Sequence, residues 1–311
     1  MWALYTIISV LMVVIANIGY KYILEDAEPL AVALIINIFV LLALAPFAIK
    51  KIGSEALKKK KIIFNRTAAA ALLIGGVLDA LAFFLLLKAY ELGDFSVVTP
   101  IRNITPLFSL FLGTKMLKEK AGPYVIIGTF LLTFGIIIIS ATQNFAPEAD
   151  IWRKIFSAPS LLALAVAFLS ALIVIANKYG VGEKYGGMNP LLYTASTMII
   201  GIICYSAALL FTPAAGIFKI IAEYWQILII LGVFSAAASW SLLKAYSTGN
   251  VIQISPLFRS QVLLGVILGG AFFSEEYILI RLAGAVILFM GIILIVVPAG
   301  KKFSDSASFS L

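Results

Sequence analysis

Apolar segments of about 20 residues recur along this chain, and they limit the folds open to it more than any other feature. A helix needs about 20 apolar residues to cross the hydrocarbon core of a bilayer. Only 12% of the residues are Asp, Glu, Lys or Arg, against about 25% in soluble domains. We therefore predict an all-α integral membrane protein with ten transmembrane helices, at 2–22, 30–49, 67–90, 95–116, 122–141, 159–179, 190–211, 224–246, 251–273 and 277–297.

The basic residues gather in a few connections between these segments. They crowd the loop at 50–66, the short loop at 115–120 and the end of the chain. Cytoplasmic loops of membrane proteins carry such an excess of Lys and Arg. We therefore expect a multi-pass protein of the cell membrane (plasma or inner) with both termini in the cytoplasm. The same distribution argues against a nucleic-acid partner, despite the net charge of +8.

Two residue types that are scarce or missing exclude several classes of protein. The chain has no histidine, and Cys204 is its only cysteine. The absence of histidine excludes histidine-assisted nucleophilic catalysis and histidine metal ligands, and a single cysteine excludes a cysteine metal site. No phosphate-binding loop of the ATPase type is present either. We expect no enzymatic activity, no cofactor and no metal.

The first five segments and the last five are copies of one another. Sliding the sequence by 156 positions places LLKAYELG (86–93) on LLKAYSTG (242–249) without a gap. Matches of polar residues, proline and glycine are harder to attribute to chance than matches of Leu and Ile. Further pairs in this register are Pro100 with Pro256, Gly113 with Gly269, Glu119 with Glu275, Gly128 with Gly284, and Gly135 with Gly291.

Five crossings in each copy determine the relative orientation of the copies. An odd number of crossings returns the chain on the opposite side of the membrane, so the second copy must be inverted. The charges agree, because KMLKEK (115–120) is basic and its counterpart AFFSEEY (271–277) is acidic. We predict a first five-helix repeat over 1–145, a second, inverted five-helix repeat over 157–298, and a cytoplasmic tail over 299–311.

The second half of the first copy carries the pattern of a known family. The run KAYELGDFSVVTPIRNITPLFSLFLGTKMLKEKAGPYVIIGTFLLTFGIII (88–138) resembles the repeat of EamA-type transporters in the drug/metabolite transporter superfamily. Its marks are a turn of small residues, a Thr-Pro step at the start of the fourth helix, Pro106 in the middle of that helix and Glu119 at its end. The second copy keeps most of these marks but has Val262 where the first has Pro106.

The resemblance implies a bundle of two inverted repeats around a central cavity, lined mainly by the third, fourth, eighth and ninth helices. Members move amino acids, nucleobases, sugars, phosphorylated compounds and drugs, often in exchange for protons. We expect a secondary active transporter, as an exporter or exchanger, of a small organic metabolite. The alternatives are an exporter of amines, drugs or neutral metabolites, a lipid-linked flippase subunit, and a channel. The expected partners are a small-molecule substrate and membrane lipid, with the chain a monomer or homodimer.

Asp79 lies near the midpoint of the third predicted helix. Charged groups inside a membrane are costly and usually have a function. Burial raises the pKa of a carboxyl group, which can then exchange a proton near neutral pH. Asp79 is therefore the candidate for proton coupling, and an ion pair that only joins two helices is the alternative.

Two arginines lie within predicted spans and suggest the charge of the substrate. Arg102 precedes Asn103 in the fourth span, and Arg259 occupies the position equivalent to Asn103 in the ninth. With inverted copies, each arginine lies roughly 10 Å below its own side of the membrane, at about 1.5 Å per residue. A guanidinium binds a carboxylate or phosphate bidentately, which favours an anionic or zwitterionic substrate. An internal salt bridge, such as Arg102 with Asp79, or snorkelling toward water is the alternative.

Other polar residues complete the predicted substrate site. Thr99 precedes Asn103 by four residues, and Ser255 precedes Arg259 by four, so each pair shares one helical face. Trp240 would offer a flat wall to a flat substrate, and Asn17 either lines the cavity or bonds between helices. The predicted substrate-binding residues are Arg102, Asn103, Arg259, Thr99, Ser255, Gln253, Trp240 and Asn17.

Overall fold

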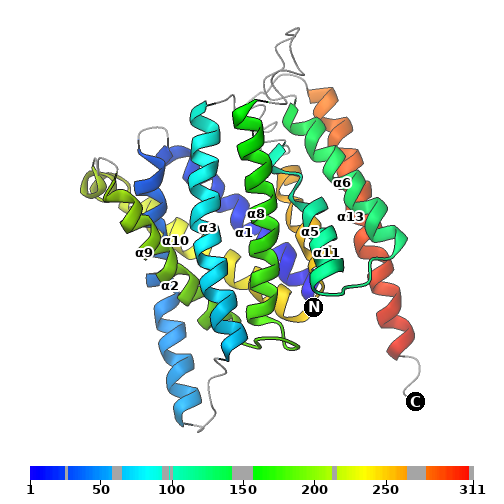
Figure 1. The fold of residues 1–311 in the computed structure, drawn as a ribbon, viewed down its shortest axis with the longest axis horizontal. Coiled ribbons are helices and arrows are strands. Elements are labelled where there is room, and N and C mark those ends of the chain that lie inside the picture. Colours follow the sequence, from blue (N-terminus) through cyan, green and yellow to red (C-terminus); the bar gives the residue numbers. More distant parts are fainter. Residues whose placement is uncertain are drawn as a thin grey trace. The chain divides into compact units, whose positions relative to one another are not determined.

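A computed structural model describes residues 1–24, 27–57, 65–92, 98, 101–141, 157–211, 216–264 and 278–307. Within these ranges the chain forms ten helices and no strand (Figure 1). The helices are α1 (Trp2–Leu24), α2 (Pro29–Leu57), α3 (Arg66–Leu92), α5 (Thr105–Met116), α6 (Pro123–Ala141), α8 (Ala158–Val181), α9 (Pro190–Leu209), α10 (Ile217–Thr248), α11 (Val251–Phe258) and α13 (Ile278–Ala307).

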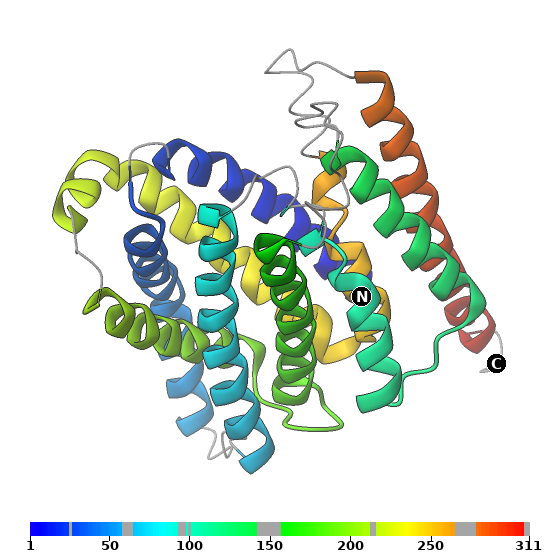
Figure 2. The same ribbon diagram turned by 45° about the horizontal axis from the view of Figure 1, so that its top comes forward.

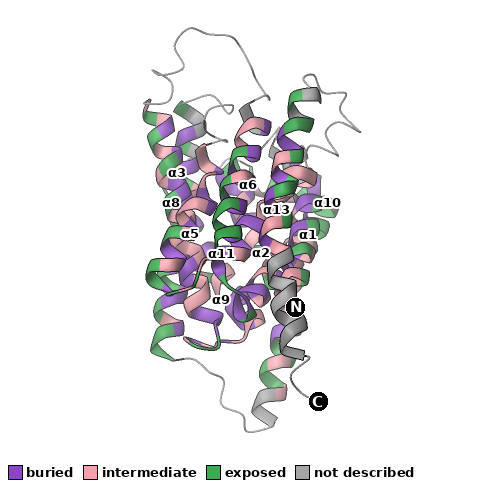
Figure 3. Cartoon of the chain, turned by 90° about the vertical axis from the view of Figure 1, so that its right-hand side faces the viewer, coloured by how far each residue is buried: buried purple, intermediate pink, exposed green. Residues whose placement is uncertain are grey.

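These helices confirm the predicted all-helical membrane architecture. Each predicted span overlaps one of them, and five helices of the described chain are long and apolar enough to cross a membrane: α2, α3, α8, α9 and α10. Shorter apolar stretches lie in α1, α6 and α13 and over 251–264. Large apolar side chains remain exposed along the helices, as Figure 3 shows for α6 and α13. Such a surface would be an aggregation hazard in water and is suited to lipid.

The helices group into two compact units, which we describe separately. Unit 1 contains Met1–Leu81 and Ala176–Thr248, and unit 2 contains Ala82–Ile175 and Gly249–Leu311. The chain passes from one unit to the other within α3 and again within α8. Each unit therefore takes helices from both predicted repeats. The boundaries of the repeats themselves stay a prediction from the sequence.

Unit 1 is built around α10, which packs against α1, α2 and α9. Its core includes Ile35 of α2 and Leu228 of α10, both fully buried. Gly232 lets α2 and α10 approach closely, because a Cβ there would lie 2.9 Å from the Phe39 carbonyl oxygen. The Ser9 hydroxyl joins α1 to α10 by donating to the Ala238 carbonyl (2.7 Å).

Unit 2 contains the clearest structural evidence that the two repeats are inverted. The helices α6 and α13 lie side by side (Figure 2). A Cβ on Gly128 would lie 2.8 Å from the Gly291 carbonyl oxygen, and one on Gly135 would lie 2.6 Å from that of Gly284. The two helices therefore run antiparallel. Since Gly128 is the counterpart of Gly284 and Gly135 that of Gly291, a local two-fold axis relates the two contacts, as inverted copies require.

We expect Gly135→Ala to destabilise the protein by about 1–3 kcal/mol, because the added methyl group meets backbone atoms that cannot move without separating the helices. The measurement is the midpoint of thermal unfolding in detergent. Gly53→Ala, on α2, is the matched control, since a Cβ there meets nothing within 4 Å. Helix propensity should make that control neutral or more stable by up to about 1 kcal/mol. Equal midpoints for Gly135→Ala and the wild type would contradict the close approach of α6 and α13.

Candidate functional site

The predicted site residues divide between the two units. Asn17, Asp79 and Trp240 belong to unit 1, whereas Arg102, Asn103, Gln253, Ser255 and Arg259 belong to unit 2. Thr99 and the side chain of Asn17 lie outside the described residues.

Asp79 lies on the otherwise buried side of α3. The exposed apolar residues of this helix form one stripe, which consists of Leu73, Ile74, Val77, Leu81 and Phe84. At about 100° per residue, Asp79 points some 160° or more away from the centre of that stripe. Its helical neighbours Gly75 and Ala82 are buried, but Asp79 itself is exposed. The carboxylate is thus accessible from the side of α3 that does not carry the exposed apolar stripe.

One turn before Asp79, three helices of unit 1 meet at Gly75. A Cβ on Gly75 would lie 3.5 Å from the Tyr193 hydroxyl oxygen on α9 and 3.7 Å from Asn177 Oδ1 on α8. Tyr193 is completely buried. Its hydroxyl has no hydrogen-bond partner among the residues that the structure describes.

The turn between α8 and α9 fixes the position of Tyr193. Asn189 begins α9 by accepting a hydrogen bond from the Leu191 amide (2.9 Å), and Pro190 occupies the first helical turn, where its missing N–H costs nothing. Gly180 is required near the end of α8, because a Cβ there would lie 2.1 Å from the Tyr193 ring. The phenol ring therefore lies directly on the α8 backbone.

Trp240 lies on the exposed face of α10. It follows Ile229 and Val233, which are exposed apolar residues, at helical spacing. Its ring packs edge-on against Tyr5 of α1, with 6.1 Å between the ring centroids. A role in substrate binding stays a prediction, and the described packing of Trp240 is with Tyr5.

In unit 2, the fourth and ninth predicted spans are both interrupted, and at equivalent positions. The chain turns at Asn103–Ile104 and again at Arg259–Ser260. The Ile104 amide donates to the Ile101 carbonyl (3.1 Å) and the Val262 amide to the Arg259 carbonyl (3.2 Å). These bonds span three residues where an α-helix spans four, while Ile104 and Arg259 keep right-handed helical dihedral angles. The regular α-helices expected over 95–116 and 251–273 are thus each interrupted by a short, tighter turn.

The two interruptions do not depend on Pro106 alone. This residue lies in the first turn of α5, not in mid-helix as expected. The second copy has Val262 at that place and still turns at the equivalent residues. The feature common to both copies is a proline three residues before each turn, Pro100 or Pro256. A proline disturbs the turn that precedes it, so Pro106 accounts for the turn at Asn103–Ile104, whereas Pro256 does not account for the turn at Arg259–Ser260.

The helices α5 and α11 pack antiparallel. The Ser255 hydroxyl donates to the Ser109 hydroxyl (2.9 Å), and both side chains are buried. Further along α5, a Cβ on Gly113 would lie 2.7 Å from Ile252 Cγ2. Residue numbers therefore rise along α5 while they fall along α11. The register can be continued by one turn, from Ser109 toward the start of α5 and from Ser255 toward the end of α11. The two interruptions then lie at the same level.

Polar side chains surround the two interruptions. Asn103 is buried, and Arg102, Gln253 and Arg259 are half-buried. The Thr105 hydroxyl donates to the Arg102 carbonyl (2.8 Å) and so satisfies a backbone group freed by the turn. Gln261 Oε1 is buried without a partner in the described part of the chain. The register thus brings Arg102, Asn103 and Arg259 to one level of the α5–α11 pair, whereas Ser255 and Gln253 lie one to two turns away, toward the level of Ser109 and Gly113.

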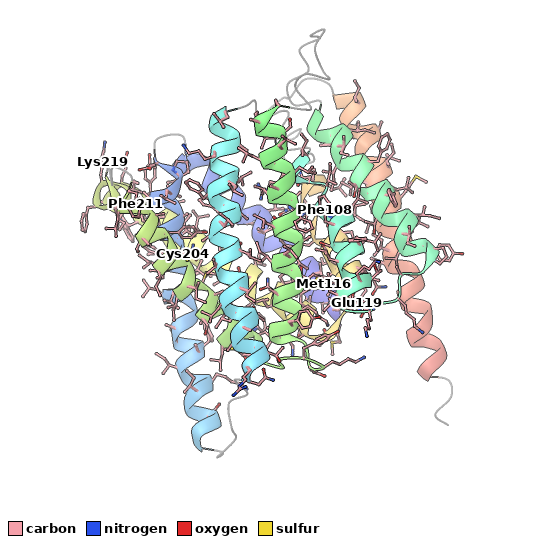
Figure 4. The ribbon with its side chains drawn as sticks, viewed as in Figure 1. Phe108, Met116, Glu119, Cys204, Phe211 and Lys219 are labelled. Carbon is pink, nitrogen blue, oxygen red and sulfur yellow. The ribbon has the colours of Figure 1, made fainter. Side chains whose placement is uncertain are left out.

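Glu119 connects the end of α5 to the beginning of α11 (Figure 4 labels it at that end of α5). Lys118 has a φ of 53°, which reverses the chain so that the Glu119 amide donates to the Gly113 carbonyl (3.1 Å). The Glu119 carboxylate then accepts hydrogen bonds from the amides of Val251 (2.9 Å) and Ile252 (3.0 Å). The first amides of a helix have no partner within the helix and favour a negative charge. Glu119 therefore caps α11.

Sequence reasoning missed several of these residues. Tyr193 stands in an apolar run with no motif around it, and Ser109 lies on a helix whose rotation is set by packing. The only signal for the Glu119 cap was the recurrence of a glutamate at the equivalent position, Glu275. That recurrence does not identify the atoms that the carboxylate binds.

Comparisons with known proteins agree with this architecture. The pattern of the EamA-like transporter family matches residues 1–141 and again 158–297. A protein of Brucella anthropi named riboflavin transporter is 26% identical over 181 residues, which cover 57% of this chain and 58% of that protein. The match thus spans less than two thirds of the relative. A solved crystal structure covers 97% of this chain and 98% of its own with a TM-score of 0.72 and 14% identity, which shows the fold alone.

We expect Glu119→Gln to lower the stability by about 1 kcal/mol and Glu119→Ala by about 2–3 kcal/mol, because hydrogen bonds to a charged acceptor are stronger than those to a neutral one. Thermal unfolding in detergent measures both changes. Glu223→Gln is the matched control, since Glu223 is exposed on α10 and should be neutral. A Glu119→Ala protein as stable as the wild type would show that the cap contributes nothing.

Proposed function

The chain belongs to the EamA-like transporter family, and from this premise we propose that it is a secondary active transporter of a small organic metabolite. We propose that it works by alternating access, as an exporter or exchanger, and without enzymatic activity. The observation that carries the proposal is the pair of equivalent interruptions at Asn103–Ile104 and Arg259–Ser260 in antiparallel helices. Transporters with inverted repeats bind their substrates at such interrupted helices.

The charged residues favour an anionic or zwitterionic substrate. Arg102 and Arg259 lie at the two interruptions, and a guanidinium fork there suits a carboxylate or phosphate. Asp79 is the candidate for proton coupling. Its exposure on the side of α3 away from the apolar stripe supports this role, because a group that exchanges protons with a substrate pathway needs access to water.

A second candidate is a neutral, flat substrate. The observation in its favour is the name of the Brucella anthropi relative, riboflavin transporter, because riboflavin carries a flat ring system without a formal charge. Amines, drugs and other neutral metabolites fall in the same group of alternatives. A lipid-linked flippase subunit and a channel are less well supported, since inverted repeats favour alternating access over a permanently open pore.

We propose a location in the plasma or inner membrane with both termini in the cytoplasm, on the basis of the basic loops. Single cysteines in a Cys204→Ala background test this orientation. An impermeant maleimide added to intact cells should label Phe211→Cys, on an outward connection, and spare Lys184→Cys until the cells are opened. Both residues are exposed. The reverse pattern would overturn the proposed orientation.

Uptake into proteoliposomes tests the mechanism. The panel contains labelled glutamate, citrate, glucose 6-phosphate, riboflavin and a quaternary amine, with and without a pH gradient. We expect accumulation of an anion or zwitterion by the wild type, at least a tenfold loss with Arg259→Ala, and loss of the pH-gradient dependence with Asp79→Asn. Arg259→Lys should recover part of the rate, because it keeps the charge but not the fork.

Arg66→Ala is the matched control, since Arg66 is an exposed arginine at the start of α3. Thermal unfolding of each variant separates lost transport from lost folding. Movement of riboflavin or the amine alone, unaffected by substitution of Arg259 and Asp79, would overturn the arginine-based mechanism in favour of the second candidate. A wild-type protein that moves none of the panel would count against the proposed substrate classes.

A further inference from the structure

The Tyr193 hydroxyl is the least explained polar group in unit 1. The side chain is completely buried, and the hydroxyl oxygen has no partner among the described residues. Buried hydroxyl groups are nearly always hydrogen-bonded, and one without a partner costs free energy. A phenylalanine would fill the same space without that cost. The hydroxyl therefore calls for a partner that the described residues do not supply.

The surroundings of the hydroxyl restrict what such a partner can be. The nearest polar side chain across Gly75 is Asn177, whose Oδ1 lies 3.7 Å from the position of a Gly75 Cβ, against 3.5 Å for the Tyr193 oxygen. Asn177 is only half-buried. The absence of a side chain on Gly75 thus leaves two neighbouring polar groups, from α8 and α9, facing the same point on α3.

Asp79 extends this polar region along α3. It follows Gly75 by one helical turn, which is roughly 6 Å along the axis at about 1.5 Å per residue. Both residues point to the side of the helix away from the exposed apolar stripe, and Asp79 is exposed there. An exposed carboxylate therefore lies within one helical turn of the point on α3 where Tyr193 and Asn177 meet.

We propose that Tyr193 and Asn177 form a polar subsite of the substrate pathway, which binds an uncharged hydrogen-bonding group of the cargo. This inference rests on the proposed transport function. A tyrosine hydroxyl and an asparagine amide each offer a donor and an acceptor, and together they complement the adjacent N–H and C=O of an amide or ring imide. The subsite is closed in the present conformation, because Tyr193 packs on Gly75, and a shift of α3 against α8 and α9 opens it.

The variant Tyr193→Phe separates this role from a structural one. We expect it to be as stable as the wild type or more stable, because it removes an unpaired buried hydroxyl. Its KM for the transported panel member should nevertheless rise about tenfold, the worth of one lost hydrogen bond, and Asn177→Ala should act in the same direction. The two probes compared first are riboflavin and glutamate. Riboflavin carries a ring imide, whereas glutamate carries no uncharged amide or imide.

Tyr205→Phe is the matched control, as a second buried tyrosine of α9, and its KM should not change. A wild-type protein that transports while Tyr193→Phe keeps the wild-type KM would overturn the subsite and leave the proposed function standing. A lower stability of Tyr193→Phe, without a change in KM, would equally overturn it, because the hydroxyl would then have a structural partner.

Cysteine labelling tests the subsite without knowledge of the cargo. In a Cys204→Ala background, a small anionic methanethiosulfonate should modify Asn177→Cys and Tyr193→Cys in membranes. Leu192→Cys is the control, because it creates a comparable space at a buried neighbour and should stay unmodified. If the reagent modifies neither Asn177→Cys nor Tyr193→Cys, the inference is overturned, even if the wild type transports a member of the panel. Modification would support it even if the wild type moves no member of the panel.

Discussion

A backbone amide or carbonyl without a partner in the hydrocarbon core costs several kcal/mol, and this constraint governs the whole arrangement. Continuous helices such as α3 and α8 satisfy it internally. The interrupted helices need other partners, and unit 2 supplies them. Three-residue hydrogen bonds close the turns at Asn103 and Arg259, and the Thr105 hydroxyl binds a freed carbonyl. The Glu119 carboxylate covers the first amides of α11.

The interruptions bring polar groups to places where a straight apolar helix offers none. A straight apolar helix offers a substrate only side chains, whereas a turn within a span also offers backbone groups and shifts the direction of the side chains. Arg102, Asn103, Arg259 and Gln261 all lie at or beside a turn. In unit 1, the polar groups Asp79, Asn177 and Tyr193 lie around the side of α3 away from its exposed apolar stripe. Each unit thus has its own polar region within its apolar helices.

The sequence predicted the parts of this structure that depend on local composition or on repetition. Hydropathy located all ten helices, and the register of 156 positions paired Gly128 with Gly284 before their helices were seen to pack together. The turns at Asn103 and Arg259 were not predicted, because the mean hydropathy of a span is the same whether its helix is interrupted or straight. The exposure of Asp79 was not predictable either, since α3 is apolar on both sides and only packing decides which side is covered. Gly75, which lies beside the Tyr193 hydroxyl, and the amides that Glu119 binds are far away in the chain from those residues, so no local pattern could reveal them.

The paired glycines of α6 and α13 have a consequence for the origin of the chain. Gly128 meets Gly291 and Gly135 meets Gly284. Because Gly284 is the counterpart of Gly128 and Gly291 that of Gly135, both copies use the same two positions, and the first position of each copy meets the second position of the other. This is the geometry of an isologous interface, in which a surface is complementary to itself. A five-helix ancestor could thus have formed a symmetric dimer from two identical chains inserted in opposite directions. Fusion of the two genes would then fix one chain in each orientation and free the two halves to diverge.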